Sequence, residues 1–503
     1  MSRTRKFAYG VGFGYVNQMV LMAAGLWLTP FLLRTLGTSQ YGLWVVVAQV
    51  LVYLGLLDFG IVAILPRSVA GAAGSGDATS RAVEISHRIA SILPIVGVQT
   101  LLAGLAAALL LIFLPSPWEP IRIPITMLLV VYVFLFPLRI PQAVLAGLQD
   151  NRFLGILQLL AWGLGTIATV LLVYRGYALK SLAAGWILTQ CSISFCSIFR
   201  LLLRFPETVP RRFPVFDFRA QRKLLAQGGW VSVAQVAQML LAGTDVLLIG
   251  KLLGAEAVVT YAITGKLIAV LANQPQILMQ VAVPGLSEMR GFSTPSAIAR
   301  VSCALTQGML LVTGLVVCVV LATNRAFVWT WVGRQHFGGF AITGLMLIGM
   351  LLRHLNVSAV YTIFAFGAER RIAIVNLIDG LVSMGVASFL LPRVGIAGAA
   401  IGLIAGVTLV SLPANYSALL SITESTFRDY WRPLVPWALR LIPLAAGCAL
   451  LQQWLVPESL FGVALTAIGV TVVYTAAMRV AVLTSPLSQY LPQRIIRWAA
   501  PAF

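Results

Sequence analysis

Apolar runs long enough to cross a membrane recur along the whole chain and are separated by short polar segments. A transmembrane helix needs roughly 20 largely apolar residues. The pattern therefore predicts an all-α integral membrane protein with about fourteen transmembrane helices. The predicted spans are 7–33, 41–65, 89–114, 123–145, 153–173, 179–203, 225–250, 258–284, 301–323, 340–364, 372–391, 396–420, 434–455 and 460–482.

The composition agrees with this pattern. Of the 503 residues, 59% are hydrophobic and 10% are charged, and the mean hydropathy is +0.94. Soluble proteins carry about 25% charged residues, so a surface this apolar must face lipid. The net charge of +20 would suggest nucleic acid in a soluble protein. In a membrane protein, basic residues instead hold loops in the cytoplasm and meet anionic lipid heads, so we predict membrane lipids and no nucleic acid as partners.

The basic residues also orient the predicted spans. With the N-terminus placed in the cytoplasm, 25 of the 35 Lys and Arg residues fall on the cytoplasmic side and 8 fall on the opposite side. The remaining two, Lys266 and Arg353, lie within predicted spans. Cytoplasmic loops are enriched in basic residues. An even number of spans then predicts that both termini are cytoplasmic.

Short motifs recur weakly between the two halves of the chain. Arg34-Thr-Leu-Gly37 matches Lys251-Leu-Leu-Gly254, and two later matches follow in the same order at offsets of 218 to 219 residues. Spans one to six and seven to twelve are therefore predicted to be two related lobes in one orientation. The predicted domains are an N-terminal lobe at 1–204, a basic cytoplasmic linker at 205–224, a C-terminal lobe at 225–422, and the last two spans with a cytoplasmic tail at 423–503.

Several of these motifs resemble those of a known group. The sequence is similar to the polysaccharide-transporter branch of the multidrug/oligosaccharidyl-lipid/polysaccharide exporter superfamily. The motifs that carry the resemblance are Arg34-Thr-Leu-Gly37 with Tyr41-Gly42-Leu43-Trp44, Leu57-Asp58-Phe-Gly60, Asp245-Val-Leu-Leu-Ile-Gly250, Trp331-Val-Gly333 through Phe337, and Gly395-Ile-Ala-Gly-Ala-Ala-Ile-Gly402.

This resemblance implies two six-helix lobes in a V-shaped, alternating-access arrangement, with two extra C-terminal helices. It implies a flippase in the bacterial inner membrane that moves an undecaprenyl-diphosphate-linked oligosaccharide to the outer leaflet. The product would serve lipopolysaccharide or exopolysaccharide biosynthesis, with polymerase or export machinery as further partners. Members with fourteen helices resemble the lipid II flippases, whose last two helices form a groove for the lipid tail. Such a protein is a transporter and not an enzyme.

Charged residues inside predicted spans are the first candidates for a site, because each costs about 2.5–3.5 kcal/mol to insert. Arg353 lies near the middle of span ten and could hold phosphate or sugar oxygens through its fork of donors. The alternative is a structural pair with an acidic residue such as Asp379, which is itself a candidate for gating or ion coupling. Lys266 in span eight could contact substrate or pair with Asp245 on span seven, and Asp245 could itself serve as a proton site.

Three further charges lie near the predicted cytoplasmic ends of spans. Asp58 and Arg67 could gate the cytoplasmic mouth, although placement at the interface is the favoured explanation for them. Arg139, between Pro137 and Pro141 in span four, could line the cavity or extend to the interface.

Amide side chains are a second set of candidates. Amides suit sugar hydroxyls, although hydrogen bonding between helices is an equal alternative. The candidates are Asn17 and Gln18 on span one, Gln235 and Gln238 on span seven, and Asn273 on span eight. Pro275 and Pro284 could also kink span eight.

The sequence carries no nucleotide- or metal-binding motif. No Walker loop is present, and the three His and five Cys residues are scattered without ligand spacing. We expect no cofactor and no metal, and H⁺ or Na⁺ as the coupling ion. Two alternatives stay open: a membrane glycosyltransferase, polymerase or ligase acting on the same lipids, and a drug/cation antiporter of the same superfamily. The antiporter would need acidic sites in its cavity, whereas the central charges here are mostly basic.

Overall fold

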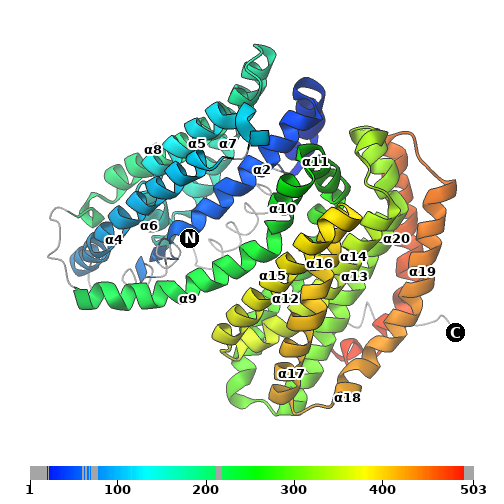
Figure 1. Ribbon diagram of the computed structural model, residues 1–503. Helices are drawn as coiled ribbons and strands as arrows, with labels where there is room; N and C mark the ends of the chain where they lie inside the picture. Colours follow the sequence, from blue (N-terminus) through cyan, green and yellow to red (C-terminus); the bar gives the residue numbers. More distant parts are fainter. Residues whose placement is uncertain are drawn as a thin grey trace. The chain divides into compact units, whose positions relative to one another are not determined.

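The computed structural model describes residues 20, 22–58, 60, 62, 65–66, 68–69, 78–114, 116–210 and 218–491. Within these ranges the chain is helical, with short connections and no strand (Figure 1). The chain divides into two compact units, residues 1–236 and residues 237–503. The boundary falls inside α9 (Phe218–Ala242), and each unit is described by itself below.

The first unit is a bundle with a continuous apolar core. Residues such as Leu65, Ile89 and Phe136 are buried together in it, from helices far apart in sequence. Its helices are Met22–Leu36, α2 (Thr38–Leu54), α4 (Ala78–Ile112), α5 (Arg122–Leu135), α6 (Arg139–Gly147), α7 (Asn151–Tyr174) and α8 (Leu179–Arg204).

The second unit is built around α13 (Pro295–Trp331), a helix of 37 residues that contacts most of its neighbours. Buried clusters surround it, and the last two helices pack directly against it. The other helices are α10 (Thr244–Leu252), α11 (Ala255–Thr264), α12 (Lys266–Phe292), α14 (Phe340–Ala365), α15 (Glu369–Val394), α16 (Ala397–Gly406), α17 (Leu412–Thr423), α18 (Phe427–Trp431), α19 (Val435–Trp454) and α20 (Leu460–Val482).

The predicted membrane spans correspond to helices of the structure. Ten helices in the described residues are long and apolar enough to cross a membrane, and the number rises to 13 when each of three bent helix pairs counts as one span. These 13 match predicted spans two to fourteen in order. The helix Met22–Leu36 overlaps predicted span one, most of which lies outside the described residues. The all-α membrane fold is confirmed, and the count of fourteen stays a prediction.

Three predicted spans are bent rather than continuous. The bends are 52° between α5 and α6, 50° at Gly243 between α9 and α10, and 47° at Gly265 between α11 and α12. The last bend lies at Gly265, before Pro275 and Pro284, which both fall within α12; a kink of α12 at these prolines stays a prediction. Glycine weakens a helix through its backbone entropy, and a break is least costly there.

The internal repeat is visible in the backbone. Gly37 and Gly254 both have positive φ, at 81° and 91°, and each precedes the start of a helix. Gly176 and Gly395 form a second pair, with φ of 84° and 64°. These conformations strongly favour glycine. Their offsets of 217 and 219 residues match those of the sequence motifs, so the repeat extends from sequence to local structure.

Small residues bring helices close at equivalent places in both units. In the first unit, a Cβ added to Gly185 of α8 would lie 2.6 Å from the Gly165 carbonyl oxygen of α7. In the second, a Cβ added to Gly402 of α16 would lie 2.6 Å from the Ser383 carbonyl oxygen of α15. Small residues allow membrane helices to approach closely. Gly185 and Gly402 are 217 residues apart, as the repeat requires.

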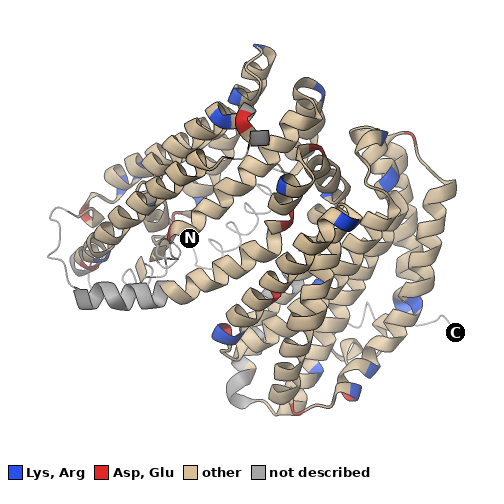
Figure 2. Cartoon of the chain, viewed as in Figure 1, with Lys and Arg blue, Asp and Glu red and all other residues tan. Residues whose placement is uncertain are grey.

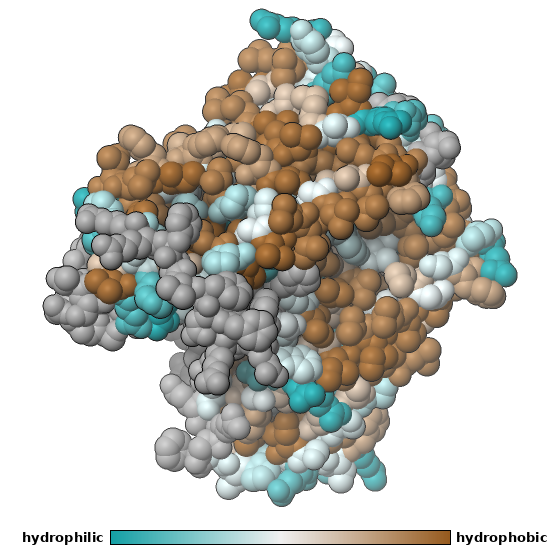
Figure 3. Space-filling view, turned by 60° about the vertical axis from the view of Figure 1, so that its left-hand side comes forward, coloured by the Kyte–Doolittle hydropathy of each residue, from teal (hydrophilic) through white to brown (hydrophobic). Residues whose placement is uncertain are grey.

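The distribution of residue types fits a membrane environment. Most of the described charged residues lie toward helix ends, and few interrupt the helices (Figure 2). Large hydrophobic side chains are widely exposed, among them Leu101, Phe113 and Trp454 at 76%, 76% and 87%. The face in Figure 3 is accordingly dominated by hydrophobic residues. Such a surface is stable against lipid and not against water.

Candidate functional site

Arg353 and Asp379 form a buried ion pair in the second unit. Arg353 Nη1 lies 2.5 Å from Asp379 Oδ2, and Nη2 lies 3.0 Å from Oδ1, so the guanidinium donates to both carboxylate oxygens. The Asp379 side chain is fully buried and that of Arg353 is 17% exposed. A paired arrangement of this kind offsets much of the cost of burying two charges.

Two serines complete the coordination of Asp379. Ser383, one turn further along α15, donates to Asp379 Oδ1 at 3.1 Å. Ser411 of the neighbouring helix donates to Asp379 Oδ2. With two donors from Arg353 and two hydroxyls, both carboxylate oxygens are satisfied. The alternative considered from the sequence, a structural pair between Arg353 and Asp379, is therefore what the structure shows.

The helix that carries Ser411 is irregular beside this pair. Residues Val407–Ser411 form a π-helical turn between α16 and α17. Just before it, Gly406 approaches so closely that an added Cβ would lie 2.3 Å from Asp379 Oδ1. Single π-helical turns are frequent at functional sites, because they re-aim side chains within an otherwise regular helix. Here the turn directs the Ser411 hydroxyl at the carboxylate.

The first unit holds its own charge cluster, around Asp58 and Arg139. Arg139 Nη1 is 4.0 Å from Asp58 Oδ2, the outer limit of an ion pair. The Gly60 amide donates to Asp58 Oδ1 at 2.8 Å, and Gln99 donates to the Asp58 backbone carbonyl at 2.7 Å. The Asp58 side chain is 6% exposed, whereas that of Arg139 is 36% exposed. Asp58 is thus held in place while Arg139 is only loosely paired.

Three polar atoms in this cluster have no hydrogen-bond partner among the described protein atoms. They are Arg139 Nη1, the Tyr132 hydroxyl and Gln99 Oε1, and all three are buried. Leaving a buried polar group unsatisfied costs about 1–3 kcal/mol. Unsatisfied groups gathered at one place therefore suit a site that receives water or a polar ligand.

The bend between α5 and α6 positions Arg139. The chain leaves α5 at Leu135, passes Pro137 and restarts as α6 with Arg139 as its first residue. The Arg139 guanidinium carbon lies 5.7 Å from the Phe136 ring centroid, within cation–π range. Proline cannot continue the helical hydrogen bonding, so the break here has a sequence cause.

Lys266 and Asp245 are not an ion pair in the structure. Asp245 lies at the start of α10, where the Val246 amide donates to its Oδ1 at 2.9 Å. Lys266 begins α12, after the bend at Gly265, and is half-buried. No carboxylate among the described residues lies within 4.0 Å of its amine. Lys266 is therefore an uncompensated cation within a predicted span.

The amide candidates differ in their surroundings. Gln235 is half-buried with its Oε1 unpartnered, and Gln238 and Asn273 are exposed. Asn17, Gln18 and the charged candidate Arg67 lie outside the described residues.

Sequence reasoning missed several members of both clusters. Ser383 carried a usable signal, because it follows Asp379 by four residues and so shares its helix face. Tyr132, Gln99 and Ser411 carried none, since only the tertiary packing brings them to the charges. Within the described residues, no group of three or more His, Cys, Asp or Glu side chains could hold a metal ion.

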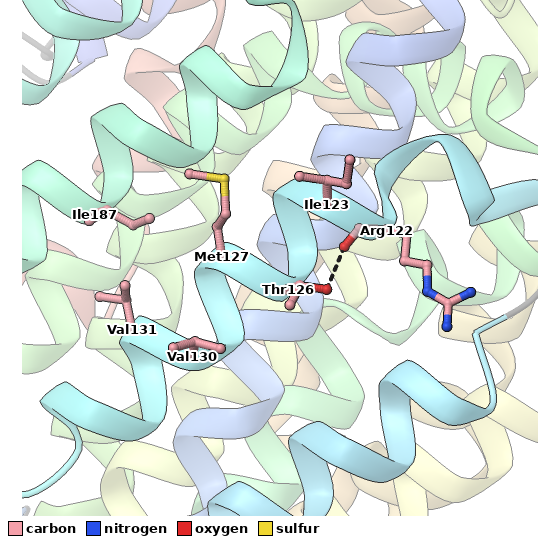
Figure 4. Close-up of a pocket in the computed structure, with 7 residues that line it drawn as sticks. All are labelled: Arg122, Ile123, Thr126, Met127, Val130, Val131 and Ile187. Carbon is pink, nitrogen blue, oxygen red and sulfur yellow. Dashed lines mark hydrogen bonds between the residues drawn. The ribbon is translucent and has the colours of Figure 1, made fainter.

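A pocket of about 550 Å³ opens between α5 and α8 on the first unit (Figure 4). Its lining is apolar apart from Arg122 and Thr126, and the Thr126 hydroxyl donates to the Arg122 carbonyl at 2.7 Å. Ile123 and Val130 of its wall are 59% and 62% exposed. None of the residues of the Arg353–Asp379 and Arg139–Asp58 pairs lines this pocket. Its chemistry suits a lipid chain rather than a polar headgroup.

Comparison with known proteins supports the resemblance noted in the sequence. A family described as polysaccharide biosynthesis protein matches residues 96–336. A Shigella flexneri protein named "Putative O-antigen transporter" is 21% identical over 426 residues, which cover 82% of this chain and 97% of that protein.

Solved structures match the fold over most of the chain. The lipid II flippase MurJ in an inward closed conformation matches with a TM-score of 0.63 at 11% identity, covering 92% of this chain and all of that one. An inward-facing multidrug resistance MATE family transporter of the MOP superfamily matches with a TM-score of 0.57 at 14% identity, covering 81% and 95% of the two chains. The chain therefore has the fold of transporters of this superfamily.

Proposed function

We propose that this protein is a flippase that moves an undecaprenyl-diphosphate-linked oligosaccharide from the cytoplasmic to the outer leaflet of a bacterial inner membrane. The observation that carries this proposal is the sequence similarity to a protein named as an O-antigen transporter, which extends over 97% of that protein's length. The match to a polysaccharide biosynthesis family supports it independently. A lipid-linked glycan is the form in which such a polysaccharide precursor meets a membrane transporter.

The charges inside the helices support an anionic cargo. Lys266 has no carboxylate partner within the described residues, and Arg139 is loosely paired. The Asp379 carboxylate, in contrast, is fully occupied by Arg353 and two serines. A path with available cations suits the negative charge of a diphosphate. A drug/cation antiporter would need available carboxylates, and so fits this arrangement less well.

In this proposal the candidate residues have different roles. Each unit offers one cation to the diphosphate, Arg139 in the first and Lys266 in the second, and exposed amides such as Gln238 and Asn273 contact sugar hydroxyls. Arg353 stabilises the second unit through Asp379 and does not contact the cargo. Asp58 or Asp245 would respond to a coupling ion, H⁺ or Na⁺. The termini would be cytoplasmic, with the four predicted domains arranged as the sequence indicates.

The test is the leaflet accessibility of lipid-linked oligosaccharide in cells that lack the protein. We expect the glycan to accumulate on the cytoplasmic leaflet and wild-type protein to relieve the block. Lys266→Gln should relieve it poorly, whereas Lys251→Gln, which removes an exposed cation at the end of α10, should act as wild type.

One outcome would contradict the flippase function, and a second would contradict only the role of Lys266. If the glycan reaches the outer leaflet normally but stays unpolymerised or untransferred, a membrane enzyme becomes the better explanation. If Lys266→Gln and Lys251→Gln are both fully active, flipping is retained as the function but Lys266 is removed from the cargo path.

A further inference from the structure

Two arginines of the second unit lie against a single tryptophan. The Arg325 guanidinium carbon is 4.2 Å from the Trp329 ring centroid, and that of Arg334 is 4.6 Å from the same centroid. Arg325 also lies 5.4 Å from the centroid of Phe340. These are cation–π distances, and they bring two like charges within about 9 Å of each other.

The local fold produces this arrangement. Arg325 and Trp329 are one turn apart near the end of α13, so they share a helix face. The helix ends as the amides of Val332 and Gly333 both donate to the Val328 carbonyl, at 3.0 and 3.2 Å. Gly333 has φ of 107°, a conformation that favours glycine, and the chain then continues into the short helix that begins with Arg334. Arg334 is thereby directed back toward Trp329.

The two charges are not compensated by the protein. No carboxylate in the described part of the chain lies within 4.0 Å of either guanidinium. Arg325 makes one hydrogen bond, to the Gln452 carbonyl of α19 at 3.5 Å, and Arg334 is exposed. The remaining N–H donors of the two guanidinium groups are therefore available. Because two like charges this close repel each other, binding of an anion between or beside them is favourable.

The surroundings indicate where the anion comes from. Phe327 stacks on Trp331 at 5.1 Å, and Phe337 meets Phe340 edge-on at 5.8 Å. Aromatic residues gather at the membrane–water interface, at the depth of lipid headgroups. The cluster also lies at the junction between two apolar helices that could span the membrane. Lipid headgroups carry their phosphate groups at this depth at both faces of the bilayer.

We propose that Arg325, Arg334 and Trp329 form a binding site for the phosphate of a lipid headgroup, distinct from the two intramembrane charge clusters. The guanidinium forks hold phosphate oxygens, and the indole keeps the two forks in position. Two lipids carry this chemistry, an anionic phospholipid and a polyprenyl diphosphate. The site follows from the membrane fold and does not depend on the proposed flippase activity.

The test uses purified full-length protein in detergent and native mass spectrometry to count bound lipid. The probes are phosphatidylglycerol, undecaprenyl diphosphate and, as a lipid without phosphate, diacylglycerol. The variants are R325Q/R334Q, which removes both charges, and R325K/R334K, which keeps the charges but removes the forks. The matched control is R393Q, because Arg393 stacks alone on Phe389 at 3.7 Å.

We expect R325Q/R334Q to weaken binding of the phosphate-bearing lipids by about tenfold or more, with R325K/R334K intermediate. Diacylglycerol binding and R393Q should be unaffected. Displacement of phosphatidylglycerol by equimolar undecaprenyl diphosphate would support the site and identify a polyprenyl diphosphate as its ligand. Retention of phosphatidylglycerol in the same competition would support the site and identify a phospholipid as its ligand.

Three results would overturn the proposal. The first is equal binding of phosphate lipids by the wild type and R325Q/R334Q. The second is an equal loss in R393Q, which would indicate a non-specific effect of surface charge. The third is an equal loss of diacylglycerol by a variant that stays folded, which would show that the two arginines do not select for phosphate. If R325Q/R334Q does not fold, wild-type affinity in R325K/R334K overturns it instead.

Discussion

Arg139 in the first unit and Arg353 in the second each stand beside one buried carboxylate, but at different distances. Arg353 donates to both oxygens of Asp379, at 2.5 and 3.0 Å. Arg139 approaches one oxygen of Asp58 no closer than 4.0 Å. The Arg139 side chain is also about twice as exposed, at 36% against 17%. The two units thus use the same pair of residue types in a closed and an open arrangement.

The neighbouring groups differ in the same direction. Around Asp379, two serine hydroxyls donate to the carboxylate. Every buried polar side-chain atom of this cluster has a hydrogen-bond partner; its members are Arg353, Asp379, Ser383 and Ser411. Around Asp58, three buried polar atoms lack a partner among the described residues. Full satisfaction makes a polar network rigid, whereas partial satisfaction leaves it costly unless a ligand or water completes it. The comparison therefore assigns binding to the cluster around Asp58 in the first unit, called the first cluster below, and stability to the cluster around Asp379 in the second unit, called the second cluster.

The largest expected effect is the loss of stability in Arg353→Met. This change leaves the Asp379 carboxylate buried without its counter-charge, and the free energy of unfolding should fall by about 3–5 kcal/mol. Arg139→Met is the matched control and should cost less than about 1 kcal/mol, since its pair is loose and partly exposed. Unfolding in detergent micelles measures both.

The double variant Arg353→Met/Asp379→Leu sharpens this test. It removes both charges together and should recover much of the lost stability. If Arg353→Met keeps wild-type stability but abolishes flipping, the structural role of Arg353 is contradicted, and Arg353 instead binds the cargo.

The next effect is on transport and concerns Arg139→Gln. A charge-assisted hydrogen bond is worth about 1.5–3 kcal/mol, so the rate of flipping should fall roughly 10- to 100-fold with little change in stability. Arg122→Gln is the control, since Arg122 pairs with Glu119 on the exposed surface at 3.0 Å. The measurement is the flipping rate of the wild type and of both variants after reconstitution into lipid vesicles. An equal loss in both variants would show that Arg139 acts through general surface charge.

The sequence was sufficient for the helices and for part of the second cluster. Long apolar runs have one stable solution in lipid, so 13 predicted spans correspond to helices or bent helix pairs. Asp379 was the foreseen alternative partner for Arg353, because intramembrane charges pair. The matching motifs at Gly37 and Gly254 also correspond to matching backbone conformations, since both glycines have positive φ.

The first cluster could not be read in the same way. Asp58 and Arg139 lie on different predicted spans, and nothing local indicates that their helices bring them together. The bends at Gly243 and Gly265 were missed because glycine is common in membrane helices without bending them.

A smaller effect concerns the glycine that admits the Asp379 carboxylate. In Gly406→Ala the new Cβ would lie 2.0 Å from Ser383 Oγ and 2.3 Å from Asp379 Oδ1, so the second cluster must shift. Overpacking of this kind costs about 1–3 kcal/mol. The control is Gly385→Ala on α15, where the added Cβ meets nothing within 4 Å and stability should rise by up to about 1 kcal/mol. Equal stabilities in detergent would show that the π-helical turn is not tightly packed against Asp379.

The smallest expected effect on stability comes from removing one tyrosine hydroxyl from each unit, one that has a partner and one that has none. The Tyr416 hydroxyl of the second unit donates to the Leu355 carbonyl at 3.2 Å, so Tyr416→Phe should cost about 1 kcal/mol. The Tyr132 hydroxyl is buried without a partner, so Tyr132→Phe should cost nothing or stabilise slightly. Unfolding of both variants in one detergent gives the difference. If Tyr132→Phe costs as much as Tyr416→Phe, a bound water already satisfies that hydroxyl. The polar groups of the first cluster would then be satisfied like those of the second, and the argument that Arg139 binds the cargo would fail.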